Sequence, residues 1–195
     1  MKKPFYMKRI LVHTKELNPL CKKAATWIDK NFKGKNPLVV GVLNGCVFFY
    51  THVLENVTIP VQTDFVKIQS NRSSDYVSKK PKIIYDTFYS PKNRHVLILE
   101  DICDSGWSLV FLKEYLKARG AKSVKICVLI DKPTGRMTPI KLDYVCRTIP
   151  NAWIVGWGFD ADNYLRNLPF IGELDSKYHK NIEPIKKRDF LYSKK

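Results

Sequence analysis

Residues 96–109 read VLILEDICDSGWSL, and this stretch decides the fold. Its apolar beginning, Val96–Leu99, predicts a strand that is buried on both faces. A helical pattern follows over Gly106–Ala118, and a second apolar run, Val124–Ile130, predicts another buried strand. A strand, a helix and a strand within about 35 residues form a unit that joins two parallel strands. The stretch therefore predicts an α/β fold with a central parallel sheet flanked by helices.

Acidic and polar residues stand where the first of these strands ends. Glu100 and Asp101 follow the apolar run directly, at the carboxyl end where open parallel sheets bind their ligands. Two carboxylates suit Mg2+, which is usually shared with substrate oxygens. Asp104 and residues 105–108 then precede the helix, where backbone N–H groups and the positive helix end favour a phosphate. A plain helix cap is the alternative for Asp104-Ser105, but the full order of strand, acid pair and turn favours a ligand site.

The rest of the chain predicts the elements that complete the sheet. The expected helices are Leu17–Phe32 and Gly45–Leu54, and the expected strands are Pro37–Leu43, Val61–Ile68, Asp143–Cys146 and Trp153–Gly156. Lys82–Phe88 is expected to form one arm of a hairpin. The polar segment Gln69–Lys82 is predicted to be a mobile loop, and the tail from Tyr178 onward has no clear period.

Length and composition suit a single domain with a buried core, because the 195 residues are 45% hydrophobic and 12% aromatic. No apolar run approaches the roughly 18 to 20 residues of a membrane span, and the basic N-terminus leads into no signal stretch. We therefore expect a cytoplasmic protein with no membrane partner. The five cysteines are scattered without a C-x-x-C pair, which predicts reduced and buried thiols.

The net charge of +16 raises nucleic-acid binding as an alternative function. Residues 1–9 hold four basic and no acidic residues, and residues 177–195 hold seven basic and two acidic ones, so more than half of the excess lies at the two ends. No helix-turn-helix, zinc-finger or RNA-recognition string occurs in the sequence, and no G-x-x-x-x-G-K-[ST] phosphate loop occurs either. Nucleic acid is therefore disfavoured as a partner, and both basic ends are expected to lie outside the site.

The stretch 96–109 resembles the signature of the type I phosphoribosyltransferases, which bind phosphoribosyl pyrophosphate. The resemblance implies that Glu100 and Asp101 contact the ribose hydroxyls, partly with Mg2+. It also implies that Asp104 is catalytic and acts as general base or acid on the ring proton of a purine. The loop that would hold the 5′-phosphate consists of Ser105, Gly106, Trp107 and Ser108. Because such a loop works through its backbone, the bulky side chain of Trp107 is expected to point away from the phosphate.

Further motifs narrow the resemblance to the hypoxanthine-guanine phosphoribosyltransferases. Leu43-Asn44-Gly45 resembles their pyrophosphate loop, in which a non-proline cis peptide is common and is expected here between Leu43 and Asn44. Arg166, in YLRNLP, corresponds to an arginine that binds pyrophosphate. Lys132, in IDKP, corresponds to a lysine that donates to the 6-oxo group of the purine, so that adenine should be a poor substrate.

The segment Ile149–Asp160 resembles the purine-binding stretch of the same family. Trp153 would stack on the base, and the carbonyl of Trp153 or Ile154 would accept a hydrogen bond from a 2-amino group. Asp160 resembles an acid that binds a second Mg2+ through water. The implied purine-binding set is Lys132, Trp153, Ile154 and Asp160, and the implied metal-binding set is Glu100, Asp101 and Asp160.

The resemblance spans residues 38–174 and implies one domain with the type I phosphoribosyltransferase fold and a small hood subdomain. The core would cover about residues 36–132. The hood would combine the N-terminal segment with residues 133–175, and residues 177–195 would form a basic tail.

The resemblance also implies the reaction. Phosphoribosyl pyrophosphate and hypoxanthine or guanine would give IMP or GMP and pyrophosphate, with Mg2+ as cofactor and a homodimer or homotetramer as the assembly. Acceptance of xanthine and a preference for guanine are alternatives within this class. A regulatory relative without activity is an alternative outside it, and the retained Asp104, Lys132 and Arg166 argue against that alternative.

Overall fold

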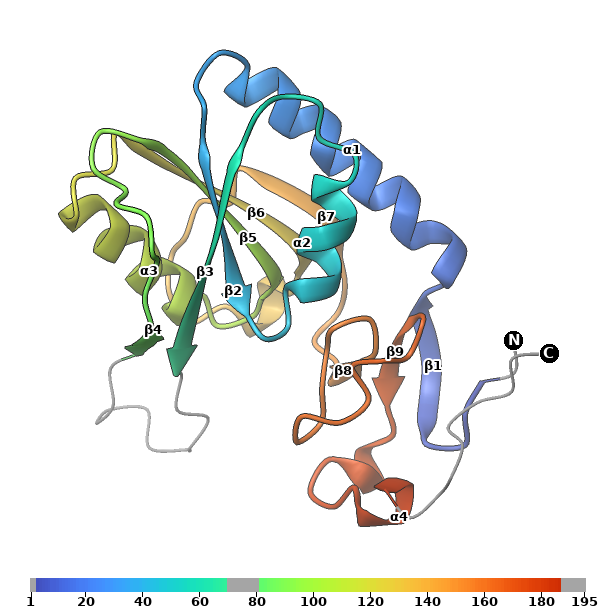
Figure 1. Cartoon of the computed structure of the whole chain (residues 1–195). Helices are drawn as coiled ribbons and strands as arrows, with labels where there is room; N and C mark the ends of the chain where they lie inside the picture. The colour runs from blue at the N-terminus through green and yellow to red at the C-terminus, as the bar shows by residue number, and fades with distance from the viewer. Residues whose placement is uncertain (1–2, 70–80, 187–195) are drawn as a thin grey trace.

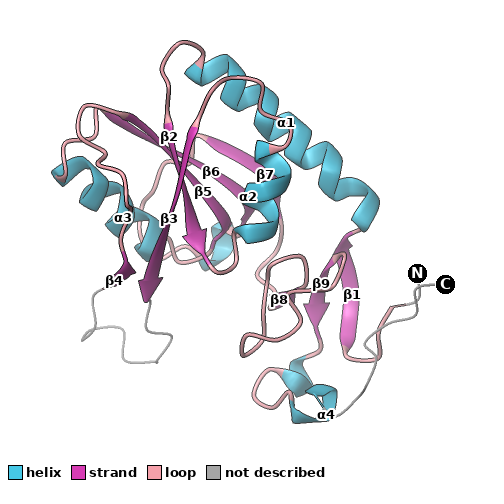
Figure 2. Cartoon of the chain, viewed as in Figure 1, coloured by secondary structure: helices cyan, strands magenta, loops and turns pink. Residues whose placement is uncertain are grey.

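The structure is a computed structural model, and it describes residues 3–69 and 81–186. Most of the predicted loop Gln69–Lys82 lies outside the described residues. The described chain forms a six-stranded sheet in the order β4-β3-β2-β5-β6-β7 and a three-stranded sheet in the order β1-β9-β8 (Figures 1 and 2). Helices α1 and α2 cover one face of the larger sheet and α3 covers the other (Figure 1).

The observed elements agree with most of the predicted ones to within a few residues. The larger sheet contains β2 (Leu38–Leu43), β3 (Gln62–Gln69), β4 (Lys82–Tyr85), β5 (His95–Cys103), β6 (Ser123–Asp131) and β7 (Tyr144–Thr148). The smaller sheet contains β1 (Met7–Val12), β8 (Ile154–Val155) and β9 (Ile171–Leu174). The helices are α1 (Thr14–Phe32), α2 (Val47–Leu54), α3 (Trp107–Ala118) and α4 (Glu183–Lys186), with short 3-10 turns at Pro133–Gly135 and Ser176–Tyr178.

The larger sheet is parallel except at one edge. Strands β2, β3, β5, β6 and β7 pair in parallel, and β4 pairs antiparallel with β3. This pairing confirms the predicted parallel sheet and the predicted hairpin arm. Strand β5 continues to Cys103, so that Glu100 and Asp101 lie within the strand and not after it. The parallel strands bring their carboxyl ends to one edge of the sheet, where ligands of such folds bind.

Strand β5 is buried on both faces because apolar residues occupy its successive positions. Leu97 and Leu99 pack in a cluster with residues of α1 and α2, whereas Val96 and Ile98 pack in a cluster with residues of α3. All four side chains are fully buried. Burial of such a side chain contributes about 1.5–3 kcal/mol. The prediction of a doubly buried strand is confirmed, and β5 is a rigid support for the acids near its end.

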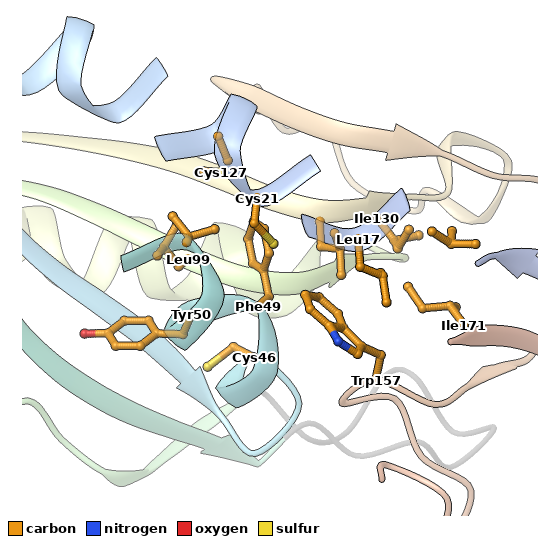
Figure 3. Packing of buried hydrophobic residues seen from close by; sticks show 14 of the residues in the cluster. Leu17, Cys21, Cys46, Phe49, Tyr50, Leu99, Cys127, Ile130, Trp157 and Ile171 are labelled. Atoms are coloured by element: carbon orange, nitrogen blue, oxygen red, sulfur yellow. The ribbon is translucent and has the colours of Figure 1, made fainter. Parts of the chain in front are cut away.

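The smaller sheet forms a hood beside the larger one. Trp157 of the hood packs in the main hydrophobic core with Leu17 of α1 and Ile130 of β6 (Figure 3). The hood also has a small core of its own, which consists of Tyr6, Met7, Val155, Ala161, Leu165, Leu168, Phe170, Leu174, Ile182 and Ile185. The hood is therefore attached to the main core and stabilised by a cluster built from both ends of the described chain.

Three features differ from those expected. Tyr144–Thr148 was placed in the hood, but it pairs in parallel with β6, so the core continues well past residue 132. This edge strand is only half-buried and lacks a continuous apolar run, so the sequence did not indicate that it belongs to the larger sheet. Strand β1 was not predicted, and it pairs antiparallel with β9. The predicted tail begins inside the hood, because Ile182 and Ile185 are buried there.

Among residues 3–69 and 81–186, no helix combines the length and the apolar character that crossing a membrane requires. The prediction of reduced and mostly buried thiols is confirmed. All the cysteines are free, with Cys146 half-buried and the others buried, namely Cys21, Cys46, Cys103 and Cys127.

Candidate active site

A cavity of about 1090 Å3 lies at the carboxyl ends of β2, β5 and β6 and is bordered by the hood. All the residues that were predicted from the sequence to form a site line this one cavity. They are Leu43, Asn44, Gly45, Glu100, Asp101, Asp104, Ser105, Gly106, Trp107, Ser108, Lys132, Trp153, Ile154, Asp160 and Arg166. Asn151 and His179 also line it and were not predicted. The fold thus brings together segments that are distant in the sequence.

The acid pair, Glu100 and Asp101, belongs to strand β5 and lines the cavity. Glu100 and Asp101 are both buried, and the backbone N–H of Asp101 donates to Oε1 of Glu100 at 3.1 Å. Burial raises the pKa of both carboxyls, and the adjacent Asp101 raises the pKa of Glu100 further, well above its ordinary value. The charge of Arg166 opposes the rise in the pKa of Asp101. A cation in the cavity would stabilise the charged form of both side chains.

The predicted pyrophosphate loop packs directly on this acid pair. The peptide bond between Leu43 and Asn44 is cis, as expected. A Cβ atom on Gly45 would lie 1.8 Å from Oδ2 of Asp101, and one on Gly158 would lie 2.3 Å from the carbonyl oxygen of Gly45. No side chain fits in either space, so glycine at both positions lets the loop, the acid pair and the hood meet.

The predicted phosphate loop begins helix α3 without a side-chain cap. Gly106 is the N-cap residue with a φ of 88°, in the left-handed region that favours glycine, and no side chain caps the helix there. The alternative of Asp104 or Ser105 as an ordinary cap is therefore wrong. The carbonyl of Ser105 accepts from the N–H groups of Met137 at 3.0 Å and Thr138 at 3.2 Å. The first N–H groups of the helix are left available for an anion.

Asp104 and Lys132 form an ion pair at the ends of the neighbouring strands β5 and β6. Nζ of Lys132 lies 3.2 Å from Oδ2 of Asp104, and the lysine side chain is 7% exposed whereas that of Asp104 is 48% exposed. The backbone N–H of Lys132 donates to the carbonyl of Cys103 at 3.0 Å, which ties the ends of β5 and β6 together. A Cβ on Gly135 would lie 2.2 Å from Oδ1 of Asp104. The candidate general base and the candidate purine-binding lysine are thus direct neighbours.

Arg136 holds this corner of the cavity and was not predicted from the sequence. Its guanidinium pairs with the carboxylate of Asp131, and its Nε donates to the backbone carbonyl of Asp104 at 3.0 Å. The aliphatic part of its side chain also lies against Gly106. The only available signal was its place in the turn after the IDKP segment, and nothing in that turn indicates which carbonyl an arginine would reach.

Asp160 and Arg166 are engaged with each other. The distance between Nη2 of Arg166 and Oδ1 of Asp160 is 2.9 Å. Arg166 also donates to the carbonyl of Gly158 at 2.5 Å and to Oδ1 of Asn163 at 3.1 Å. The second carboxylate oxygen of Asp160 accepts from the N–H of Asn163 at 2.8 Å. These contacts hold the hood segment around residues 158–166 in place. They also set the positively charged guanidinium of Arg166 beside the acid pair.

The aromatic wall comes from the hood. Trp153 is 39% exposed and lines the cavity, and its carbonyl accepts from the N–H of Leu174 at 2.8 Å. This bond engages the carbonyl of Trp153, which favours Ile154 as the acceptor for a ligand. Trp107, at the start of α3, has a side chain that is 46% exposed at the edge of the cavity. The direction expected for Trp107 relative to a phosphate stays a prediction.

Comparison with known proteins identifies this arrangement. Residues 11–162 match the family model of the phosphoribosyl transferase domain. The chain is 38% identical over 175 residues to the hypoxanthine-guanine phosphoribosyltransferase of Streptococcus pneumoniae, a match that covers 90% of this chain and 97% of the relative. The hypoxanthine phosphoribosyltransferase of Staphylococcus aureus matches in structure with a TM-score of 0.86 and 31% identity, covering 90% of this chain and 96% of that one.

A further solved structure is the hypoxanthine phosphoribosyltransferase of Trypanosoma cruzi in complex with the product IMP. It matches with a TM-score of 0.83 and 31% identity, covering 91% of this chain and 99% of that one. The chain therefore belongs to the phosphoribosyltransferase family, and within that family it groups with the hypoxanthine-guanine enzymes.

Proposed function

We propose that the chain transfers the phosphoribosyl group of phosphoribosyl pyrophosphate to hypoxanthine or guanine, giving IMP or GMP and pyrophosphate. The observation that carries this proposal is the single cavity in which the acid pair, the loop before α3, the glycine loop and the Lys132–Asp104 pair meet. The family relation supports it, because the S. pneumoniae relative is a hypoxanthine-guanine phosphoribosyltransferase and the T. cruzi neighbour binds IMP.

The phosphoribosyl group would lie over β5 and the start of α3. Residues 105–108 would bind the 5′-phosphate through backbone N–H groups, the serine hydroxyls and the positive end of a 12-residue helix. Glu100 and Asp101 would accept hydrogen bonds from the ribose hydroxyls. Glycine suits position 106 of this loop because its φ is left-handed and a Cβ there would lie 3.1 Å from the Arg136 side chain.

The acid pair would also hold Mg2+. Two buried carboxyls with raised pKa values form a donor set that a divalent cation would stabilise, and oxygen ligands of this kind suit magnesium. Within the described parts of the chain, no three His, Cys, Asp or Glu side chains surround one metal position, so substrate oxygens and water would complete the coordination. When bound, Mg2+ neutralises charge on the pyrophosphate group. Asp160 is the weaker candidate ligand because it is paired with Arg166.

The purine would lie between the core and the hood. Trp153 offers an aromatic face for stacking, and the carbonyl of Ile154 can accept from a 2-amino group. Lys132 carries only donors, so it can bond a 6-oxo group but not a 6-amino group. A 6-amino group would turn donors toward the donors of the buried Lys132 and offer no acceptor in exchange for Asp104, and this is the physical basis for rejecting adenine.

In the reaction, the bond from the anomeric carbon to pyrophosphate breaks and a bond to the purine nitrogen forms. Positive charge develops on the ribose as the leaving group departs. Arg166 and the backbone of Leu43-Asn44-Gly45 would stabilise the departing pyrophosphate. Asp104 would take the ring proton of the base, and Lys132 would exchange its contact with Asp104 for the 6-oxo group.

A turnover assay tests this proposal. The protein is incubated with phosphoribosyl pyrophosphate, Mg2+ and each of hypoxanthine, guanine, xanthine and adenine, and the nucleotides and pyrophosphate are measured. We expect IMP and GMP, each with one equivalent of pyrophosphate. Formation of XMP, or a strong excess of GMP, would identify the xanthine-accepting or guanine-preferring alternative. Binding of phosphoribosyl pyrophosphate without any nucleotide product would identify a regulatory relative.

We further propose a homodimer or homotetramer in the cytoplasm. Large apolar side chains are exposed on β4 and the turn that follows, with Ile84 at 56%, Tyr85 at 52% and Phe88 at 82%. Exposed apolar residues of this size commonly mark protein interfaces. Light scattering coupled to size-exclusion chromatography would measure the assembly, and a strictly monomeric mass would contradict this part of the proposal.

A further inference from the structure

The segment that follows β9 returns to the cavity through one side chain. The ring centroid of His179 lies 5.1 Å from that of Trp153, and the two ring planes are inclined by 33°. Both residues line the cavity. His179 belongs to residues 177–195, which were expected from the sequence to lie outside the site.

One residue of β9 bonds to both Trp153 and His179. The backbone N–H of Leu174 donates to the carbonyl of Trp153 at 2.8 Å. The carbonyl of Leu174 in turn accepts from Nε2 of His179 at 3.1 Å, which requires a proton on that nitrogen. Trp153 and His179 are thus fixed relative to the same strand of the hood.

The chain on both sides of His179 is anchored. Before it, the carboxylate of Asp175 accepts from the N–H of Lys177 at 3.1 Å and begins the short 3-10 turn. After it, Ile182 and Ile185 are buried in the small core of the hood. The position of His179 is therefore set by the fold and not by a loose end of the chain.

The candidate base-binding groups Asp104 and Lys132 come from the core, whereas His179 comes from the hood. Asp104 and Lys132 directly follow β5 and β6, so they belong to the core. A base that reaches Lys132 and stacks on Trp153 would lie between the core and the indole. His179 is held by β9, a strand of the hood, and its ring packs on the indole of Trp153.

We propose that His179 is a positioning residue for the purine: its ring packs on the indole of Trp153 and holds that indole in place to stack on the base. The inference rests on the proposed function and adds the C-terminal segment to the base side of the site. An unsupported indole must lose rotational freedom when the base binds, and this weakens binding of the base. The groups that would bind phosphoribosyl pyrophosphate belong to other segments, so its binding should not change.

Three substitutions of His179 test whether Trp153 needs a flat ring beside it or only a side chain of similar volume. His179→Ala removes the ring, His179→Leu keeps apolar bulk, and His179→Phe keeps the flat face without the N–H group. Lys180→Ala is the matched control, since it alters the next residue, which is exposed. For each full-length variant, KM for hypoxanthine, KM for phosphoribosyl pyrophosphate, kcat and the thermal midpoint are measured.

We expect His179→Ala and His179→Leu to raise KM for hypoxanthine about three- to tenfold, the range for one side chain that must be immobilised on binding. KM for phosphoribosyl pyrophosphate and kcat should stay within about twofold. His179→Phe should restore most of the base affinity, and Lys180→Ala should match the unmodified protein.

Several results would overturn the inference. An unchanged KM for hypoxanthine in folded His179→Ala would show that the ring supports nothing, and a lower KM would show that it occupies the place of the base. An equal rise in both KM values, or equal effects of leucine and phenylalanine, would reduce His179 to general packing. If His179→Ala does not fold, the leucine and phenylalanine variants decide. An unmodified protein that converts neither oxopurine would refute the proposed function itself, whatever the variants do.

Discussion

The two sides of the cavity are built in different ways. The phosphoribosyl side is formed mainly by one continuous passage, residues 100–108, which runs from the end of the largely buried strand β5 into the first turn of α3. The purine side is assembled from separate segments that contribute Lys132, Trp153, Asp160 and His179, and most of these depend on the small hood. A site made by one strand–loop–helix passage is rigid. Its residues are also easy to predict, because they follow one another in the sequence. A site made by distant segments depends on the tertiary packing that brings those segments together.

The largest expected effect comes from Asp104, where the two sides meet. Asp104→Asn should lower kcat by about 10²- to 10⁴-fold, the usual contribution of a general acid–base group. Its side chain is half-exposed and caps no helix, and the amide oxygen of asparagine can still accept from the buried Lys132, so the thermal midpoint should fall only slightly. Pre-steady-state kinetics would separate the chemical step from binding. A loss of only a few-fold would leave the chemistry to substrate positioning.

A second substitution is designed to break only the phosphoribosyl side. Ser108→Glu places a carboxylate beside the expected 5′-phosphate, and like-charge repulsion should weaken phosphoribosyl pyrophosphate by at least about a hundredfold. Trp107→Leu is the matched control at the neighbouring position, and it should stay within about tenfold because the loop acts through its backbone. Calorimetric titration measures both. Equal losses would mean that the indole is itself a ligand of the phosphate.

The corresponding substitution on the purine side is Lys132→Met. It keeps the length of the side chain but removes the donors, so KM for hypoxanthine should rise by about ten- to a hundredfold, as for a lost hydrogen bond to a charged group. The affinity for phosphoribosyl pyrophosphate should not change. A comparable loss of both affinities would show that the two sides are not separable.

A smaller effect is expected where Arg136 supports the phosphate loop from the neighbouring turn. Arg136→Ala leaves the carboxylate of Asp131 without its partner and should lower the free energy of unfolding by about 1–3 kcal/mol. It should also weaken phosphoribosyl pyrophosphate by a few-fold, because the carbonyl of Asp104 loses its donor. Arg119→Ala removes an ion pair with Asp86 and is the control. Chemical denaturation and titration should show a loss of affinity only in the first variant.

The smallest effect concerns the acid sensitivity of the hood. Burial alone would raise the pKa of Glu173, but hydrogen bonds and charge from Lys8 and Arg9 outweigh it and lower this pKa below its ordinary value. The resulting stability is present above the unfolded pKa of about 4.5 and is lost as the pH falls through the folded pKa. Both partners are largely exposed, so the gain is about 1 kcal/mol or less. Glu173→Gln should therefore lose less stability between pH 5 and pH 3 than the unmodified protein, as followed by thermal melts.

Sequence patterns predicted the core and the site residues better than the hood. The elements around Val96–Leu99 and Val124–Ile130 were found because continuous apolar runs indicate buried strands. The site residues were found because they occur in motifs that resemble a known family, and the structure brings them to one cavity. Strand β1 was missed because its two exposed basic residues, Lys8 and Arg9, made it look like part of a charged tail.

His179 could not be found from local sequence at all. Its place in the cavity depends on Leu174, which bonds both His179 and Trp153, and on the burial of Ile182 further along the chain. None of these residues forms a motif with His179. The lysine-rich segment around it also lacks the apolar periodicity that would predict a helix or a strand. Only the pairing of β8 with β9 brings these distant groups together.

The most direct test of the account is the ratio of kcat/KM for hypoxanthine to that for adenine, measured on the unmodified protein with saturating phosphoribosyl pyrophosphate and Mg2+. The buried Lys132 at the boundary of the two sides offers donors only, so a 6-amino group gives it no acceptor in exchange for Asp104. We predict that hypoxanthine is used at least about a hundredfold more efficiently, corresponding to about 2.8 kcal/mol. A ratio near one would contradict the assignment of Lys132 and the oxopurine function with it.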